Sequence, residues 1–109
     1  MANTFKLKTK ANVGVTTVGI YTAPAATTTV VIGITLANTS GSGVNVGVGV
    51  TRAGTTEDVK LLKNAPIPSG SSLEFMGGNK VVLETNDQIN VDSDTNNSVD
   101  ASLTIMEIT

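Results

Sequence analysis

The feature that most constrains this chain is a strict alternation over residues 44–50, where every second residue is valine and asparagine or glycine lies between. A β-strand points successive side chains to opposite faces of its sheet, so this spacing collects four valines on one face. β-branched residues also suit extended backbone better than a helix. The segment therefore predicts a strand with one face in a core.

The same period of two recurs along the chain and defines the fold class. Further alternating or apolar runs occupy residues 5–10, 13–21, 30–36, 59–61, 71–75, 80–83, 88–91 and 99–108. In the run at 30–36 the even positions are large and apolar, so we expect those side chains to face the core. Glycine, proline and asparagine clusters at 23–25, 38–43, 52–54, 66–70, 77–79, 84–87 and 92–97 predict turns. The pattern predicts an all-β protein: a single antiparallel β-sandwich or jelly-roll-like domain of about eight strands. The length of 109 residues suits one domain, residues 1–109.

The glycines opposite the valines have two interpretations. Gly47 and Gly49 are either tolerated on a solvent face or allow another backbone or subunit to approach closely. We favour close approach, because several small residues share this face.

Composition excludes several kinds of chemistry. The sequence has no histidine and no cysteine, so no Ser-His-Asp or Cys-His arrangement and no thiolate metal site can form. Carboxylates remain, but no spacing selects Glu74, Glu84 or Asp87 as a catalytic pair, and we interpret them as solvated loop acids. The glycines match no phosphate-binding fingerprint. We expect no enzymatic activity and no cofactor.

Charge and aromatic content bear on possible partners. The net charge is −2, and no basic run is interleaved with aromatic residues, so we expect no nucleic-acid partner. Lys6, Lys8 and Lys10 alternate near the N-terminus, as in an exposed strand face or a charged edge that discourages strand pairing. The three aromatic residues, Phe5, Tyr21 and Phe75, are expected in core or strand-end packing rather than on a sugar-binding platform.

No part of the sequence predicts a membrane partner. The first ten residues lack the unbroken apolar stretch of a signal peptide, and no segment is long and apolar enough to span a bilayer. We therefore expect synthesis in the cytoplasm without a signal peptide.

One segment resembles the opening of a calcium loop. Asp92, Asp94 and Asn96 place side-chain oxygens at alternate positions, and Asn97 can adopt the left-handed turn that glycine usually supplies. The closing bidentate acid is missing, because Leu103 stands at that position. Asx turns in a polar hairpin explain the same spacing without metal. Calcium stays an alternative that calorimetric titration tests.

The order of segments along the chain resembles a known family. Residues 20–40, IYTAPAATTTVVIGITLANTS, carry a strand ending in a Tyr-Thr-x-Pro corner and a second strand ending in Asn-Thr. Residues 61–73, 81–91 and 102–108 look like later strands of the same proteins, with Asn86-Asp87 where Gly-Asp is usual. These features resemble small virion proteins of tailed bacteriophages, especially marine and cyanobacterial ones, over nearly the whole chain.

The resemblance implies a non-enzymatic structural subunit of a phage particle: a head decoration, neck or tail-associated protein located in the virion. Its expected partners are further copies of itself, as a homo-oligomer, and other virion proteins. Residues 1–10 are a candidate arm that completes a neighbour's sheet. The alternative is a surface module that recognises a host receptor or glycan through the loops at 38–43 and 92–97. A hydrolase using carboxylates alone is a third hypothesis.

Overall fold

The computed structural model describes residues 3–54, 57–75 and 80–109, with only the backbone of Phe75, and these residues form nine strands. The strands are β1 Asn3–Val13, β2 Val18–Thr22, β3 Thr28–Asn38, β4 Val44–Thr51, β5 Asp58–Ile67, β6 Ser72–Phe75, β7 Val81–Leu83, β8 Gln88–Ser93 and β9 Val99–Ile108. The part of the chain that is described contains no helix with the length and hydropathy of a membrane span. The predicted turn at 77–79 lies outside the described residues.

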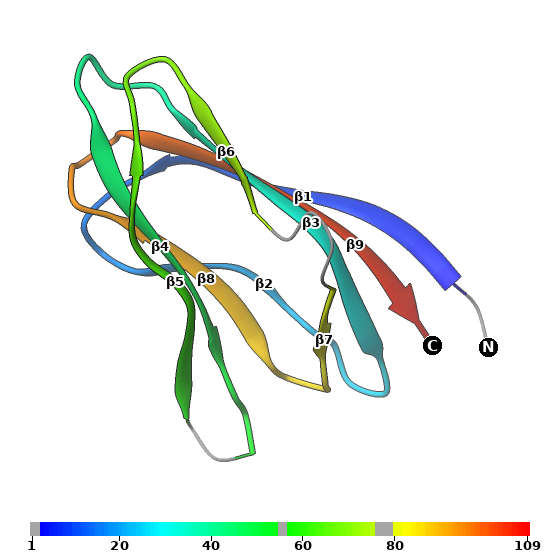
Figure 1. Ribbon diagram of the computed structural model, residues 1–109. Helices are drawn as coiled ribbons and strands as arrows, with labels where there is room; N and C mark the ends of the chain where they lie inside the picture. The colour runs from blue at the N-terminus through cyan, green and yellow to red at the C-terminus, as the bar shows by residue number, and fades with distance from the viewer. Residues whose placement is uncertain (1–2, 55–56, 76–79) are drawn as a thin grey trace.

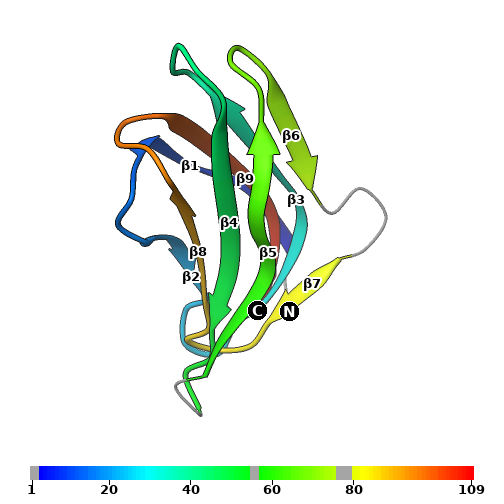
Figure 2. The same ribbon diagram turned by 60° about the vertical axis from the view of Figure 1, so that its left-hand side comes forward.

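The strands form two antiparallel sheets packed face to face (Figures 1 and 2). The first sheet has the order β1-β9-β3-β6, with β7 also paired to β3, and the second has the order β2-β8-β4-β5. β6 pairs with residues 34–37 of β3 and β7 with residues 29–31, so the two short strands share one position beside β3. The arrangement therefore has the eight positions of a jelly roll, and it confirms the predicted fold class with nine strands in place of about eight.

The core lies between the sheets and follows the predicted alternation. Val44, Val46, Val48 and Val50 of β4 are buried, and β9 contributes alternate buried residues from Val99 to Ile105. β9 lies between β1 and β3 and is paired on both edges, so it is one of the two inner strands of the first sheet, with β3. The two patterns that were clearest in the sequence thus supply core residues from the two different sheets.

The expected burial in β3 is wrong at its start, because a β-bulge changes the phase. Val31 pairs with Ile105 and Gly33 with Thr104, which leaves Ile32 as an extra residue. Val31 is buried before the bulge, and Ile34 and Leu36 are buried after it. A strict even-residue pattern cannot continue through an inserted residue, since the insertion moves the next side chains to the other face.

β5 is longer than the sequence predicts. The sequence predicts a strand at 59–61 and a turn at 66–70, but β5 continues to Ile67 through two bulges. Asn64 has a φ of 54°, the left-handed conformation that asparagine tolerates. Pro66 fits because β5 is an edge strand, where a missing N–H leaves no neighbour unpaired.

The close approach of the strands on either side, β5 and β8, accounts for the glycines of β4. A Cβ on Gly49 would lie 3.1 Å from the carbonyl oxygen of Val59, and one on Gly47 would lie 2.7 Å from Oδ1 of Asp92. Both glycines are buried. The close approach comes from neighbouring strands of the same chain.

Candidate interaction surface

The side of the first sheet that faces away from the second sheet, here called the outer face, carries an apolar row. Residues paired across antiparallel strands point to the same face. The register joins Phe5 to Met106, Met106 to Val30 and Val30 to Val82, so the row crosses β1, β9, β3 and β7. These four residues are here called the apolar row.

Large side chains of this face are open to solvent. Phe5 is 69% exposed, Leu7 66% and Val82 56%. Leu7 lies next to the row on the same face, since it pairs with Thr104. Of the two positions predicted for Phe5, core or strand end, the core is wrong, because Phe5 pairs with Met106 on the outer face. Tyr21 is buried as predicted, and the side chain of Phe75 lies outside the described residues.

The lysines of β1 lie on the opposite side of the sheet, the side of the core, although Lys6 and Lys10 stay exposed at its edge. Lys6, Lys8 and Lys10 pair with positions 105, 103 and 101 of β9, all of which are buried. Lys6 reaches Glu107, with its Nζ 2.8 Å from Oε1. The usual arrangement of an edge strand in a soluble protein is therefore reversed in β1. Its charged side chains lie on the side of the core, and its apolar side chains face water. Inward charges on an edge strand discourage edge-to-edge pairing.

Glu107 is the centre of a buried polar cluster that the sequence patterns did not predict. It is 7% exposed, and its Oε2 accepts a hydrogen bond of 2.5 Å from the Tyr21 hydroxyl, which also lies 2.8 Å from Thr29 Oγ1. The hydrogen bonds from Lys6 and then Tyr21 lower the pKa of Glu107 against the opposing effect of burial. Burial first, and then the carboxylate, raises the pKa of Tyr21 to about 12. The cluster joins β1, β9, β2 and β3 through charge and hydrogen bonds. A carboxylate in the inward phase of an alternating strand was the signal that could have revealed it.

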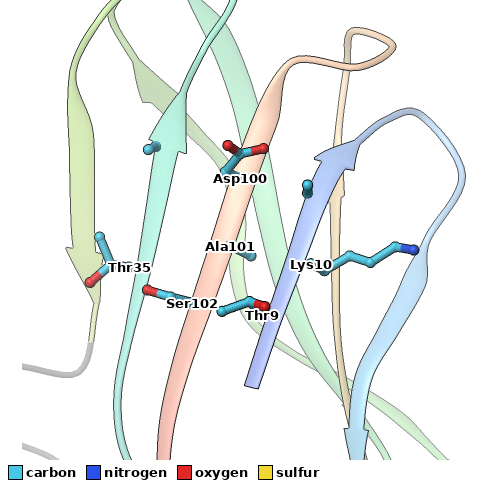
Figure 3. Close-up of a pocket in the computed structure, with 8 residues that line it drawn as sticks. Thr9, Lys10, Thr35, Asp100, Ala101 and Ser102 are labelled. Atoms are coloured by element: carbon cyan, nitrogen blue, oxygen red, sulfur yellow. The ribbon is translucent and has the colours of Figure 1, made fainter. Parts of the chain in front are cut away.

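A shallow hollow occupies the other end of the outer face (Figure 3). Thr35, Ser102 and Thr9 form a row across β3, β9 and β1, and the side chain of Lys10 extends away from it (Figure 3). The hollow has a volume of about 300 Å³. Its lining is built mostly from small side chains, with one carboxylate: Thr9, Lys10, Ala11, Thr35, Ala37, Asp100, Ala101 and Ser102. The hollow exists because these side chains are short, whereas those of the apolar row are long.

The candidate calcium residues each have a different partner. Asp92 Oδ2 accepts a hydrogen bond from Thr17 and lies 3.7 Å from Lys60 Nζ. Asp94 Oδ1 accepts one from the backbone N–H of Asn45 at 3.1 Å. Asn96 Oδ1 lies 3.5 Å from the backbone nitrogen of Val15. Among the described residues, no three acidic, histidine or cysteine side chains gather as metal ligands.

The three candidate carboxylates are not brought together. Glu74 lies on β6 and pairs with Thr35 on the outer face, whereas Glu84 and Asp87 lie in the turn between β7 and β8 and both contact Arg52. Asp87 is buried, which contradicts its interpretation as a solvated loop acid. Its oxygens accept backbone hydrogen bonds from Ala53 and Glu84. Burial alone would raise the pKa of Asp87, but these hydrogen bonds and Arg52 outweigh it and lower that pKa.

The two loops proposed for recognition lie together at the end of the sandwich away from the termini (Figure 1). The Thr39 N–H donates to the Ser98 carbonyl at 2.8 Å, and the Asp94 N–H donates to the Asn45 carbonyl at 3.0 Å. Asn38 holds its own loop through a hydrogen bond to the Ser42 carbonyl. Much of the polar capacity of these loops is used within the chain.

Comparisons with known proteins support the fold. No family model matches the sequence, and no curated protein does. A structure of disulfide-linked pili from Bacillus endospore appendages is similar, with a TM-score of 0.57 and 14% identity over 99% of this chain and 87% of that one. The T13 particle of infectious bursal disease virus has a similar chain, with a TM-score of 0.59 and 13% identity over 96% of this chain and 30% of that one. A chain from the Gx strain of the same virus is similar too, with a TM-score of 0.58 and 12% identity over 95% of this chain and 33% of that one. This chain thus spans about a third of the viral chains.

At these identities the likeness shows the fold alone. The similar proteins are structural components of pili and of virus particles. No family-level match ties the sequence to tailed phages.

Proposed function

We propose that the chain is a structural subunit of a tailed-phage particle, a head decoration, neck or tail-associated protein that acts by contact. The observation that carries this proposal is the outer face, where β1 presents Phe5 and Leu7 to solvent and turns its lysines inward. Monomeric soluble proteins rarely leave a contiguous apolar surface of this kind uncovered. A subunit that works inside an assembly has such a surface covered by its neighbours.

The fold and the composition support the same interpretation. Proteins of similar fold are parts of pili and virus particles. This sequence has no cysteine, so a disulfide link between subunits is not available to it. The contacts in our proposal are therefore noncovalent, and residues 1–109 act as one unit.

The N-terminal arm takes a specific form in this proposal. Residues 3–10 pair with β9 of the same chain, so an exchanged arm would make the same pairs with β9 of a neighbour. Deleting residues 1–10 then prevents incorporation into particles. Normal incorporation of the truncated chain into particles would refute the hypothesis that residues 1–10 act as an arm between subunits. Because the deletion also removes Lys6 from Glu107, folding is checked by circular dichroism.

The test of the proposed function is the composition of purified particles. Particles banded from a lysate of the host that produces this chain should contain it in a constant ratio to the major capsid protein, as measured by quantitative mass spectrometry. Immunogold labelling then separates head, neck and tail. Absence of the chain from the banded particles would contradict the proposal.

A recognition module is the second candidate, favoured by one observation: the loops at 38–43 and 92–97 lie side by side. A glycan array probed with the purified chain tests it. Reproducible binding that is lost on Thr39→Ala or Asp94→Ala supports recognition. If the chain binds no glycan selectively on the array, the structural role remains the function that the outer face favours.

A further inference from the structure

We propose that the outer face binds a second copy of this chain, with the apolar row of each copy seated in the hollow of the other. This inference rests on the proposed structural role and names its first partner. Three features of the face lead to a second copy as the occupant: its shape, its charge and its area.

The shape is self-complementary along the strand direction. On β9 the apolar row passes through Met106 and the hollow through Ser102, four residues apart, which corresponds to ~13 Å along a strand. We place a two-fold axis between the two outer faces, parallel to them, perpendicular to the strands and passing over Thr104. Rotation about this axis puts the end of one face that carries the apolar row over the end of the other face that carries the hollow. Met106 of one copy then lies over Ser102 of the other, and Phe5 lies over Thr9. Phe5, Met106 and Val30 then meet the shorter Thr9, Ser102 and Thr35, whereas Val82 lies over Glu74, and every contact occurs twice.

The row on the axis supports this placement. Leu7, Thr104 and Gly33 share a register row between the apolar row and the hollow. In the paired copy each of these residues meets its own equivalent. A Cβ on Gly33 would have no atom of this chain within 4 Å, so the centre of the face is open to a neighbour.

The charges also permit two copies to meet. Among the register-paired positions of the described strands, the charged residues on this face are Asp100 and Glu74. Asp100 Oδ1 already accepts a hydrogen bond from the Asn12 N–H at 3.0 Å. The lysines of β1 point to the other side, so no basic cluster opposes its own copy, and the face presents no large repulsive field.

The area is at the lower end of what a specific dimer buries, since ~600 Å² on each copy is ~1,200 Å² in total. The long strands of about ten residues rise ~33 Å, and the four strand positions, the last of them shared by the short β6 and β7, span ~19 Å, which gives a planar area of at most ~600 Å² before side-chain relief is added. A standard interface buries about 800 Å² on each partner. The separation of about 10 Å between stacked sheets matches the reach of these side chains.

The test is the oligomeric state of the purified full chain, followed by sedimentation velocity from the micromolar to the millimolar range. We expect a monomer–dimer equilibrium for the unaltered protein. A chain that stays monomeric over the whole range would overturn the proposal.

Val82 and Val15 provide a matched pair of variants, since both valines are 56% exposed and only Val82 lies on the outer face. Val82→Glu should weaken the dimer at least ~10-fold, because it buries an unpaired charge. Val15→Glu adds the same charge in the loop between β1 and β2 and should leave the dissociation constant unchanged. Equal behaviour of the two variants would overturn the proposal. Should Val82→Glu fail to fold by circular dichroism, Phe5→Glu replaces it.

Ser102→Leu tests the reciprocal packing. It fills the hollow without adding charge, so it should also weaken the dimer at least ~10-fold while leaving the fold intact. A dimer that is sensitive to Val82→Glu but not to Ser102→Leu packs in another way and overturns this arrangement.

The outcomes separate this inference from the proposed function. A chain found in particles but monomeric in solution, or dimeric through another surface, contradicts the inference alone. A dimer that depends on Val82 and Ser102 in a chain absent from particles contradicts the proposed function alone.

Discussion

Single residues decide how the edge of this sandwich is held. Glu107 is buried and ionised because Lys6 and Tyr21 donate to its two oxygens. Removing one partner of a buried hydrogen-bonded charge costs more than the net value of the pair, since the remaining group stays desolvated. The ionised carboxylate of Glu107 therefore helps to hold β1 against β9 through Lys6.

The pH dependence of stability depends on the lowered pKa values of Glu107 and Asp87. A carboxyl whose folded pKa is lowered stabilises the fold above its unfolded pKa, and this stabilisation is lost as the pH falls through the folded value. The ordinary values are 4.5 and 3.8, so the free energy of unfolding should decrease as acid is added below these values. Urea titrations at several pH values measure this decrease.

The variant Glu107→Gln distinguishes the contribution of Glu107 to the acid dependence of stability from that of Asp87. It should lower the free energy of unfolding at neutral pH by about 1–3 kcal/mol and flatten the acid dependence, while the part due to Asp87 remains. An unchanged acid profile in this variant would show that Glu107 does not contribute.

At the scale of elements, the bulges in β1, β3 and β5 determine which side chains reach the core. Asn12 and Asn64 both adopt positive φ, of 59° and 54°, in the bulged parts of β1 and β5. The carbonyls of bulged β5 in turn approach the glycines of β4. Backbone irregularity and small residues thus occur together on neighbouring strands.

Asn64→Val should destabilise the protein by about 1–2 kcal/mol, because a β-branched residue is strained at positive φ. Asn64→Gly is the matched control and should be close to neutral, since glycine adopts this conformation readily. Thermal unfolding followed by circular dichroism measures both. Equal melting temperatures for the two variants would contradict the argument.

Gly49→Ala tests the close approach between β4 and β5. The new Cβ would lie 3.0 Å from Asn90 Oδ1 and 3.1 Å from the Val59 carbonyl oxygen, so we expect a loss of about 1–3 kcal/mol. Gly41→Ala is the control, because a Cβ there meets nothing within 4 Å. If Gly49→Ala were as stable as Gly41→Ala in chemical denaturation, the strands would not be as close as the structure shows.

At the scale of the whole molecule, the core lies between the two sheets, and among the described residues the outer face of the first sheet contributes no side chains to it. The buried side chains come from both sheets, whereas the apolar row lies on the far side of the first sheet. Stability and association are therefore expected to respond to different residues.

Val48 and Val15 test this separation. Val48 is fully buried, so Val48→Ala should lower the free energy of unfolding by about 2 kcal/mol. Val15→Ala should change it by less than about 0.5 kcal/mol. Denaturant unfolding at one fixed protein concentration measures both, and comparable losses would place Val48 outside the core.

The local alternation was enough to predict the fold class and most of the strands, though not the length of β5, because alternation is directly related to the two faces of a sheet. The valines of β4 and the alternating residues of β9 are buried as that alternation predicts. The breaks in the pattern could not be predicted, since one inserted residue such as Ile32 changes the phase of the rest of its strand. Only the tertiary structure decided that β1 is an edge strand with Phe5 outward, and that Asp87 and Glu107 are buried. The physical reason is that exposure and charge state depend on partners far away in the chain, and local sequence does not name those partners.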